Sequence, residues 1–309
     1  MRYVEVDGLR LSVIGLGTWQ FGSREWGYGA SYAAEIAPAI VRRAIELGVT
    51  LIDTAEIYGF GRSERIVGRA IAADREAVVL ATKLVPALPL PAVVDWQVRG
   101  SLRRLDVQAI DLYQVHFPNP FASPRATMAP LRPLLARGVV RHVGVSNHSL
   151  GRWRASERSL GRPILTNQVR FSLTAPMPRW ELVPFAREQG RLVIAYSPLG
   201  QGLLSGRHAL GDTAPADVRR RSRLFQPRTM ALAAPLLETL RSVAAAHAAT
   251  PAQVALAWLI AQGPVVAIPG ARTVAQLEEN VAAADLELDP AELEQLTAAS
   301  SRFELATRR

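Results

Sequence analysis

The chain has 309 residues, of which 49% are hydrophobic and none is cysteine, so a large core can form whereas disulfides, thiolate metal sites and cysteine nucleophiles are excluded. No apolar run reaches the roughly 18 residues of a membrane span, and the N-terminal residues lack a secretory signal pattern, so we expect a cytoplasmic protein with no membrane partner. The net charge of +9 comes mostly from arginines that are scattered along the chain, a distribution that argues against a nucleic-acid partner. The exception to this scatter is the cluster Arg219–Arg221 with Arg223.

The predicted elements begin with a β-hairpin, because residues 2–13 alternate apolar and polar side chains around Asp7-Gly8. Short apolar runs then alternate with helical patterns. Strands are expected at 14–18, 50–53, 77–83, 109–116, 140–146, 164–169, 191–197 and 264–269. Helices are expected at 33–47, 63–72, 91–105, 125–137, 149–159, 179–189 and 251–261, with an extra C-terminal helix at 290–300.

Eight strand-helix units indicate an α/β fold whose strands are parallel. We predict a closed (β/α)8 TIM barrel, with an N-terminal β-hairpin and an extra C-terminal helix, rather than an open doubly wound sheet. Four glycines after helical patterns have the position of left-handed helix ends: Gly48, Gly138, Gly190 and Gly263. The chain, residues 1–309, is interpreted as a single domain, interrupted by a long loop at about 198–230 that is either a functional lid or disordered.

One residue count points to a chemical role. Lys83 is the only lysine among the 36 basic residues, and it ends the apolar run VVLATK. Arginine keeps its proton near neutral pH, whereas the pKa of a lysine can be tuned by its surroundings. The position of this lysine therefore favours chemistry over chance.

Four polar residues are expected to meet at one rim of the barrel. Asp53, Lys83 and His116 end successive predicted strands, and Tyr58 lies on the loop that follows Asp53. These residue types suit the reduction of a carbonyl group, because hydride attack creates an oxyanion that needs a proton. We assign Tyr58 as the acid, Lys83 as the group that tunes its pKa, Asp53 as the partner of that lysine, and His116 as the group that orients the substrate. Taken singly, each has an ordinary structural alternative, such as a helix cap or rim packing.

Five segments, in order and with the expected spacing, resemble the aldo-keto reductase family. They are GLGTWQFG (15–22), DTAEIYGFGRSERIVGRAI (53–71), IDLYQVH (110–116), GVVRHVGVSN (138–147) and IPGARTVAQLEEN (268–280). The likeness is greatest to the bacterial branch that shares long loops with potassium-channel β-subunits. It implies that Asp53, Tyr58, Lys83 and His116 are the catalytic tetrad of an NADP(H)-dependent enzyme.

The resemblance also implies a set of NADP(H) contacts. Ser146, Asn147 and Gln168 match the residues that hold the nicotinamide carboxamide, and Tyr196 matches the aromatic residue that stacks on its ring. Arg272 matches the ligand of the adenosine 2′-phosphate, beside a helix that starts at Thr273. The remaining predicted contacts are Gly17, Thr18, Trp19, Ser197, Leu199, Gly202, Gly270, Gln276, Glu279 and Asn280.

The expected activity is the reversible reduction of an aldehyde or ketone, a small-molecule carbonyl substrate. Trp26, Tyr28 and Phe117, with Trp19, are candidates for an aromatic pocket wall. A second hypothesis, motivated by the channel-subunit likeness, is an NADP-binding redox sensor with slow turnover. No spacing of His, Asp and Glu predicts a metal site, and the sequence does not indicate an oligomeric state.

Overall fold

The N-terminal hairpin forms at the predicted turn. The computed structural model describes residues 1–22, 29, 31–207 and 218–308. Strand β1 (Tyr3–Val6) pairs antiparallel with β2 (Leu9–Ser12). Asp7 and Gly8 between them have φ values of 47° and 80°, the left-handed pair that a two-residue hairpin turn requires. The hairpin prediction is therefore confirmed.

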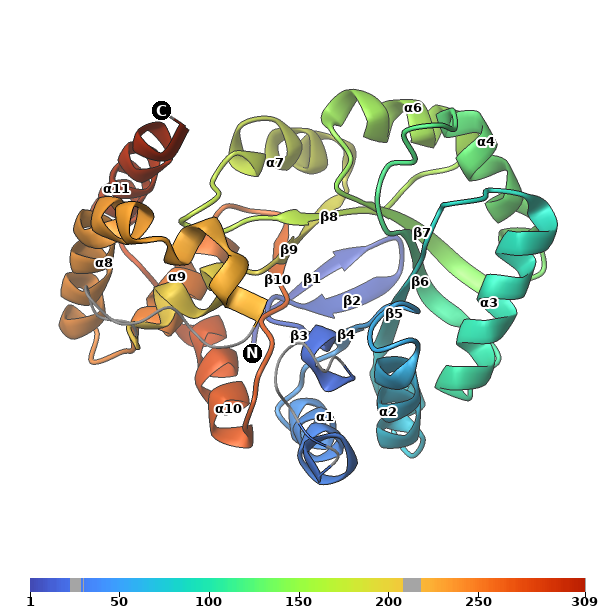
Figure 1. The fold of residues 1–309 in the computed structure, drawn as a ribbon, viewed down its shortest axis with the longest axis horizontal. Coiled ribbons are helices and arrows are strands. Elements are labelled where there is room, and N and C mark those ends of the chain that lie inside the picture. The colour runs from blue at the N-terminus through green and yellow to red at the C-terminus, as the bar shows by residue number, and fades with distance from the viewer. Residues whose placement is uncertain (23–28, 30, 208–217, 309) are drawn as a thin grey trace.

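The parallel strands follow one another in chain order around a barrel (Figure 1). In the described part of the chain this sheet has eight strands, from β3 to β10. Their bounds are β3 (Leu16–Gly17), β4 (Leu51–Asp53), β5 (Val79–Leu84), β6 (Ile110–Val115), β7 (Val140–Ser146), β8 (Thr166–Arg170), β9 (Leu192–Tyr196) and β10 (Val265–Ala267).

The first and last parts of the sheet close the barrel. Ile14 forms an isolated parallel bridge with Ala267, and the Gly15 amide donates to the Ala267 carbonyl at 2.8 Å. In return, the Ala267 amide donates to the Val13 carbonyl at 2.9 Å. The predicted closed barrel is thus confirmed over an open sheet.

Helices cover the outside of the ring of strands (Figure 1). Their bounds are α1 (Ala37–Glu46), α2 (Arg62–Ile71), α3 (Pro91–Leu105), α4 (Pro124–Met128), α5 (Arg132–Ala136), α6 (Leu150–Leu160), α7 (Pro178–Gln189), α8 (Pro227–Ala246), α9 (Pro251–Ile260), α10 (Val274–Ala282) and α11 (Pro290–Arg308).

Three predicted boundaries need correction. The helix expected over 125–137 is broken into α4, a 3-10 turn and α5, because Pro130 and Pro133 each lack the amide that an α-helix interior uses. The loop expected over 198–230 ends earlier, since α8 starts at Pro227 and short 3-10 turns occupy parts of the preceding stretch. The extra C-terminal helix is longer than 290–300, because α11 continues to Arg308.

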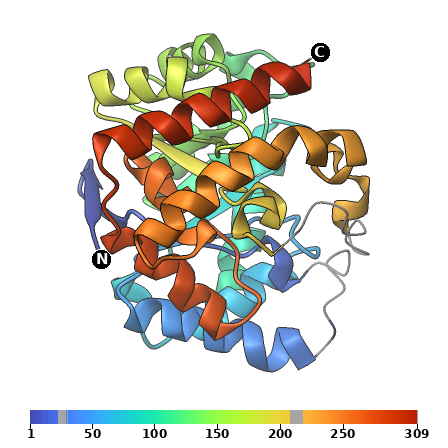
Figure 2. The same cartoon turned by 90° about the vertical axis from the view of Figure 1, so that its left-hand side faces the viewer.

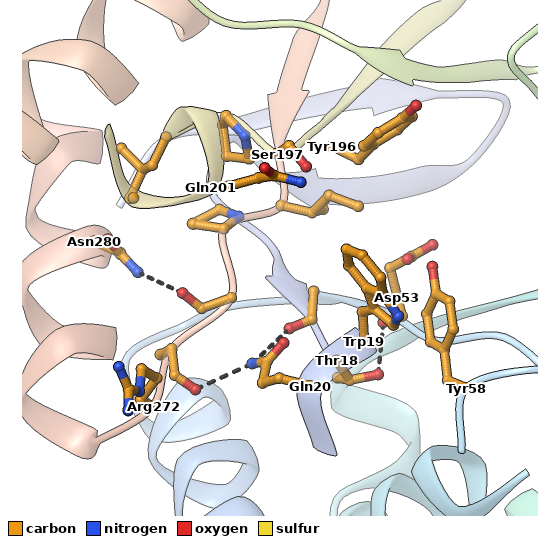
Figure 3. Close-up of a pocket in the computed structure, with 18 of the residues that line it drawn as sticks. Thr18, Trp19, Gln20, Asp53, Tyr58, Tyr196, Ser197, Gln201, Arg272 and Asn280 are labelled. Atoms are coloured by element: carbon orange, nitrogen blue, oxygen red, sulfur yellow. Dashed lines mark hydrogen bonds between the residues drawn. The ribbon is translucent and has the colours of Figure 1, made fainter. Parts of the chain in front are cut away.

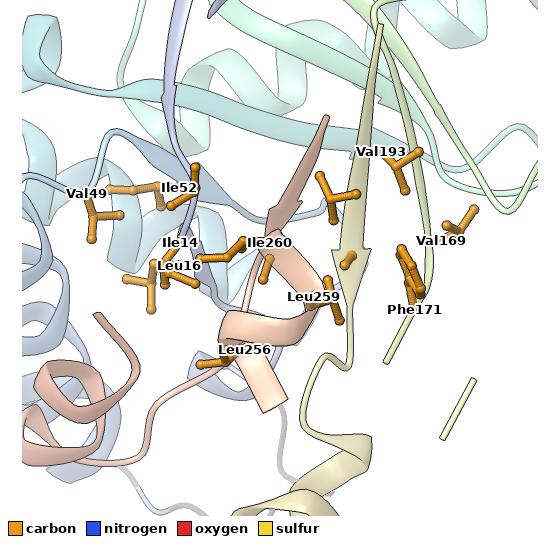
Figure 4. Close-up of a cluster of buried hydrophobic side chains, with 14 of the residues drawn as sticks. Ile14, Leu16, Val49, Ile52, Val169, Phe171, Val193, Leu256, Leu259 and Ile260 are labelled. Carbon is orange, nitrogen blue, oxygen red and sulfur yellow. The ribbon is translucent and has the colours of Figure 1, made fainter. Parts of the chain in front are cut away.

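The hydrophobic core has two parts. The larger part lies between strands and helices, where β-branched and Leu side chains from the strands meet the inner faces of helices such as α9 (Figure 4). The smaller part lies inside the barrel, where Val6, Leu9 and Leu11 of the hairpin pack on strand residues that include Leu51 and Val266. The hairpin therefore closes one end of the barrel, as the side view also shows (Figure 2).

Among the described helices, no single one is both long enough and apolar enough to cross a bilayer, although α8 and α9 together reach that threshold as a pair bent by 95°.

Candidate active site

The four predicted chemical groups come together on the loops and strand ends opposite the hairpin. Asp53 is the last residue of β4 and Lys83 is the penultimate residue of β5. His116 directly follows β6, and Tyr58 lies in the loop between β4 and α2. Since parallel strands end at the same rim, residues far apart in sequence share one site.

Lys83 is the centre of the group. Its Nζ atom donates to Asp53 Oδ2 at 2.5 Å, to the Thr54 carbonyl at 2.9 Å and to Tyr58 Oη at 3.3 Å. An ammonium has three donor hydrogens, so these contacts use all of them. The lysine is completely buried, and its charge is directed at the tyrosine hydroxyl.

Burial and charge act in opposite directions on the lysine and the tyrosine. Burial lowers the pKa of Lys83, but the charge of Asp53 and the hydrogen bonds to Asp53 and Tyr58 outweigh it, so the pKa lies above the ordinary lysine value. Burial raises the pKa of Tyr58, and the Lys83 ammonium opposes that effect only in part. Near neutral pH the lysine is therefore charged and the tyrosine keeps its proton.

His116 is neutral near physiological pH. Burial, and then the positive charge of Lys83, lower the pKa of His116 to about 3. Its ring meets the Tyr58 ring edge-on, with centroids 5.8 Å apart and planes at 82°. The Nδ1 atom is buried and has no hydrogen-bond partner in the described part of the chain. A neutral imidazole beside the tyrosine can donate one hydrogen bond to a substrate oxygen.

A cavity of about 1200 Å³ begins at these groups and extends across the barrel mouth. Asp53, Tyr58 and His116 line it, whereas Lys83 lies behind them. The structure also brings every residue of the expected cofactor set to this cavity. These are Gly17, Thr18, Trp19, Ser146, Asn147, Gln168, Tyr196, Ser197, Leu199, Gly202, Gly270, Arg272, Gln276, Glu279 and Asn280.

At the inner end of the cavity, polar groups from three strands form a connected wall. Ser146 Oγ donates to the main-chain carbonyl oxygen of Gln168 at 2.8 Å, and Asn147 Nδ2 donates to Ser146 Oγ at 3.1 Å. Tyr196 Oη donates to Asn147 Oδ1 at 3.0 Å. Asn147 and Ser197 have φ values of 57° and 49°, which turn the chain sharply at the ends of β7 and β9.

The outer end is built around the start of α10 (Figure 3). Thr273 caps the helix, because its side chain accepts a hydrogen bond from the main-chain N–H of Gln276. The side chain of Gln276 in turn accepts, at Oε1, from the main-chain N–H of Arg272 at 2.9 Å. Gln20 donates to the Ala271 carbonyl at 3.1 Å and so ties this loop to β3. A Cβ atom on Gly270 would lie 2.8 Å from Gln20 Oε1, so a side chain at position 270 would displace the end of the Gln20 side chain.

Three residues were predicted to form the wall of a substrate pocket together with Trp19. Trp26 and Tyr28 lie outside the described residues. Phe117 is 38% exposed and contacts His116 with ring centroids 5.7 Å apart, but it does not line the cavity. Of the arginine cluster, Arg219 lines the cavity and lies over the Phe225 ring.

Sequence reasoning missed several cavity residues. Gln20, Ile57 and Arg62 lie inside the segments that carried the family resemblance, yet none was singled out. Gln201 was also missed; it has a positive φ of 57° and accepts a hydrogen bond from Arg219. Across the described residues, no group of three or more His, Asp or Glu side chains is arranged to hold a metal ion.

Comparison with known proteins shows the family of this chain. The aldo/keto reductase family profile matches residues 13–301. An uncharacterized oxidoreductase of Mycobacterium tuberculosis is 53% identical over 304 residues, which cover 98% of this chain and 94% of the relative. Methylglyoxal reductase YeaE of Escherichia coli is 34% identical over 93% of this chain and 90% of its own length. A crystal structure of a Klebsiella pneumoniae aldo/keto reductase with NADP and acetate is 32% identical, with a TM-score of 0.78 and coverage of 96% and 94%.

Proposed function

Since this chain belongs to the aldo/keto reductase family, and is an NADP-dependent enzyme that acts on carbonyl groups, we propose that it reduces small aldehydes or ketones with Tyr58 as the general acid. The observation that carries the proposal is the 3.3 Å contact between Lys83 Nζ and Tyr58 Oη inside a cavity wall. A charged donor there favours the phenolate that forms when the tyrosine gives up its proton.

The residues divide the work between holding the substrate and moving a proton. The neutral ring of His116 donates to the carbonyl oxygen and holds it beside Tyr58 Oη. Tyr58 then transfers its proton to the developing alkoxide, and the Lys83 ammonium stabilises the resulting phenolate. Asp53 keeps Lys83 charged, because the buried carboxylate raises the pKa of that ammonium.

The cavity residues fit NADP(H), which supplies the hydride when bound. The carbonyl oxygen of the Gln168 side chain has no hydrogen-bond partner among the described residues, and Gln168 lines the cavity together with Tyr196. Arg272, at the N-terminus of α10, provides a charged partner for a 2′-phosphate. The turns at Ser197 and Gly202 bring backbone close to the cavity, as an anionic pyrophosphate needs.

The wall near Tyr58 is suited to a small substrate. Trp19 lies with its ring centroid 6.5 Å from that of Tyr58, and both rings line the cavity, as does Ile57, the residue before Tyr58. The Escherichia coli relative is a methylglyoxal reductase by name, so methylglyoxal is a suitable first substrate, with 4-nitrobenzaldehyde as an aromatic counterpart.

The test is the consumption of NADPH with each aldehyde by the native protein and by Tyr58→Phe. We expect native turnover above about 1 per second, and a loss of at least about 100-fold in kcat for the variant. Its dissociation constant for NADPH should stay within about threefold of the native value, because the hydroxyl is not needed to hold the cofactor.

Tyr196→Phe is the matched control, because it removes a hydroxyl from the same cavity and leaves the ring in place. We expect it to lose less than about tenfold in kcat, the cost of one neutral hydrogen bond. Equal losses in the two variants would contradict the assignment of Tyr58. Tight NADPH binding with turnover far below 1 per second in the native protein would favour a redox sensor instead.

A further inference from the structure

Asp53 has a second set of partners besides Lys83. Its Oδ1 atom accepts hydrogen bonds from Gln114 Nε2 at 3.0 Å and from Gln168 Nε2 at 2.7 Å. Gln168 Nε2 also lies 3.3 Å from Gln114 Oε1. The glutamines come from β6 and β8, so three strands contribute to one buried cluster.

The charge of Asp53 decides how both amides are turned. A carboxylate oxygen can only accept hydrogen bonds, so each glutamine must present its NH2 group to Oδ1. For Gln168 this choice leaves Oε1 on the other side of the amide. That oxygen has no hydrogen-bond partner within the described residues, and Gln168 lines the cavity. The ionised carboxylate therefore fixes a hydrogen-bond acceptor, rather than a donor, on the cavity side.

Gln114 is accommodated by the neighbouring strand. It pairs in register with Gly144 of β7, and a Cβ atom on Gly144 would lie 2.9 Å from Gln114 Cγ. A side chain at position 144 would thus clash with Gln114, and also with Thr166, whose Oγ1 atom would lie even closer to the same Cβ atom. The polar side chain at 114, near the end of β6, has two hydrogen-bonding partners, Asp53 and Gln168, for its buried amide.

We propose that Gln114 is a positioning residue, which with Asp53 holds the Gln168 amide so that its Oε1 accepts a hydrogen bond from the carboxamide NH2 of the nicotinamide. The proposal rests on the proposed function for the cofactor. It gives Gln114, a buried residue that does not line the cavity, a role in orienting that cofactor. It makes Asp53 a link between two tasks, since one oxygen holds Lys83 and the other sets the Gln168 amide.

The experiment compares the binding of NADP+ with that of its 3-acetylpyridine analogue, in which a methyl group replaces the carboxamide NH2. Dissociation constants are measured by calorimetry without substrate, on the native protein and on Gln114→Met. Methionine has a similar length but cannot hydrogen-bond. We expect the native protein to prefer NADP+ by about tenfold, the value of one good hydrogen bond, and the variant to prefer it by threefold or less.

Two further variants make the result specific. Leu112→Met, on the same strand and also buried, is a volume-conserving change and should keep the native preference. Gln114→Glu keeps the side-chain length. The new carboxyl group can donate a hydrogen bond to Asp53 only when it is protonated, because an ionised carboxylate has no hydrogen to donate and is repelled by the charge of Asp53. Its preference for NADP+ over the analogue should therefore be close to native at pH 5.5 and lost at pH 8.5. This variant keeps the proposal testable if Gln114→Met does not fold.

A tenfold preference that survives in Gln114→Met, or a Gln114→Glu preference that ignores pH, would overturn the role of Gln114. A native protein with no preference would overturn it too, because Gln168 would then not accept from the carboxamide. The proposed function fails differently: native protein that binds NADP+ with the expected preference but whose kcat is unaffected by Tyr58→Phe would contradict the role of Tyr58 alone.

Discussion

The Nζ atom of Lys83 lies 2.5 Å from Oδ2 of Asp53, and the exposed fractions of the two side chains are 1% and 2%. Removing one partner leaves the other as a buried, unpaired charge. We expect Asp53→Asn and Lys83→Met each to lower the free energy of unfolding by about 3–5 kcal/mol. The double variant should cost less than the sum of the two, because it leaves no orphan charge. Urea unfolding measures all three, and strict additivity would contradict a direct ion pair.

The pH dependence of reduction should follow Tyr58 and not His116. Tyr58 must hold its proton to act as an acid, and burial raises the pKa of Tyr58 above its ordinary value. The pKa of His116 is lowered to about 3, so this ring stays neutral throughout the working range. We expect kcat to be flat between about pH 6 and pH 9 and to fall only near or above pH 10. In Lys83→Met the fall should move to higher pH, because the ammonium lowers the pKa of Tyr58. A shift to lower pH would contradict this.

Two buried histidines should weaken the fold in mild acid. Burial, and then Lys83, lower the pKa of His116 to about 3, and burial lowers that of His148 to about 4. Between these values and the ordinary histidine pKa of about 6.5, the unfolded chain binds more protons than the folded one. Stability is therefore complete above that pH and decreases as pH falls, by about 1.4 kcal/mol per pH unit for each histidine. The urea midpoint of His116→Gln should fall less between pH 7 and pH 4.5 than that of the native protein; equal falls would exclude His116 as a cause.

Arg272 should decide the preference for the phosphorylated cofactor. Its side chain is at the start of α10, where a charged hydrogen bond to a 2′-phosphate adds to the favourable helix end. We expect Arg272→Ala to weaken NADPH binding about tenfold to 100-fold, while NADH binding changes little. Arg158→Ala, on α6 and away from this cavity, is the matched control. A similar loss for both cofactors in Arg272→Ala would count against the assignment.

A buried ion pair joins α3 to α2, the helix that follows the Tyr58 loop. Glu64, fully buried near the start of α2, accepts from Arg104 Nε at 2.5 Å and from Thr82 Oγ1 at 2.7 Å. We expect Glu64→Gln to lower the free energy of unfolding by about 3 kcal/mol, measured by urea unfolding. Glu304→Gln, which disrupts a surface pair within α11, should change it little. Equal effects would mean that the burial of Glu64 is unimportant.

Much of this site follows from sequence because strand ends are predictable. The strand expected over 140–146 coincides with β7, and Lys83 lies one residue before the end of β5. In a parallel barrel, strand ends meet at one rim whatever the details of packing. The convergence of Asp53, Lys83 and His116 therefore needed only the alternation of strands and helices.

Side-chain partners between distant strands are less predictable. Gln114 is a polar residue in a buried strand, which is a visible signal, but its partners Asp53 and Gln168 lie on β4 and β8. The orientation of the two side-chain amides depends on the Asp53 carboxylate between them, and the sequence alone does not show that these three groups meet.

Helix α8 was missed for a different reason. Its apolar residues do recur at helical spacing, at Met230, Ala233, Leu237 and Leu240. The preceding stretch is rich in Gly, Pro and Arg, and Pro235 lies inside the helix. These residues favour a loop locally, and only packing against neighbouring helices such as α9 and α11 outweighs that preference.

The bridge between Ile14 and Ala267 has a consequence for biosynthesis. A nascent chain on the ribosome cannot pair these residues until Ala267 has left the exit tunnel. Until then, the first part of the sheet has an exposed edge that can associate with other chains. Closure of the barrel therefore comes late in folding, and chaperone capture is most useful in the interval before Ala267 leaves the exit tunnel.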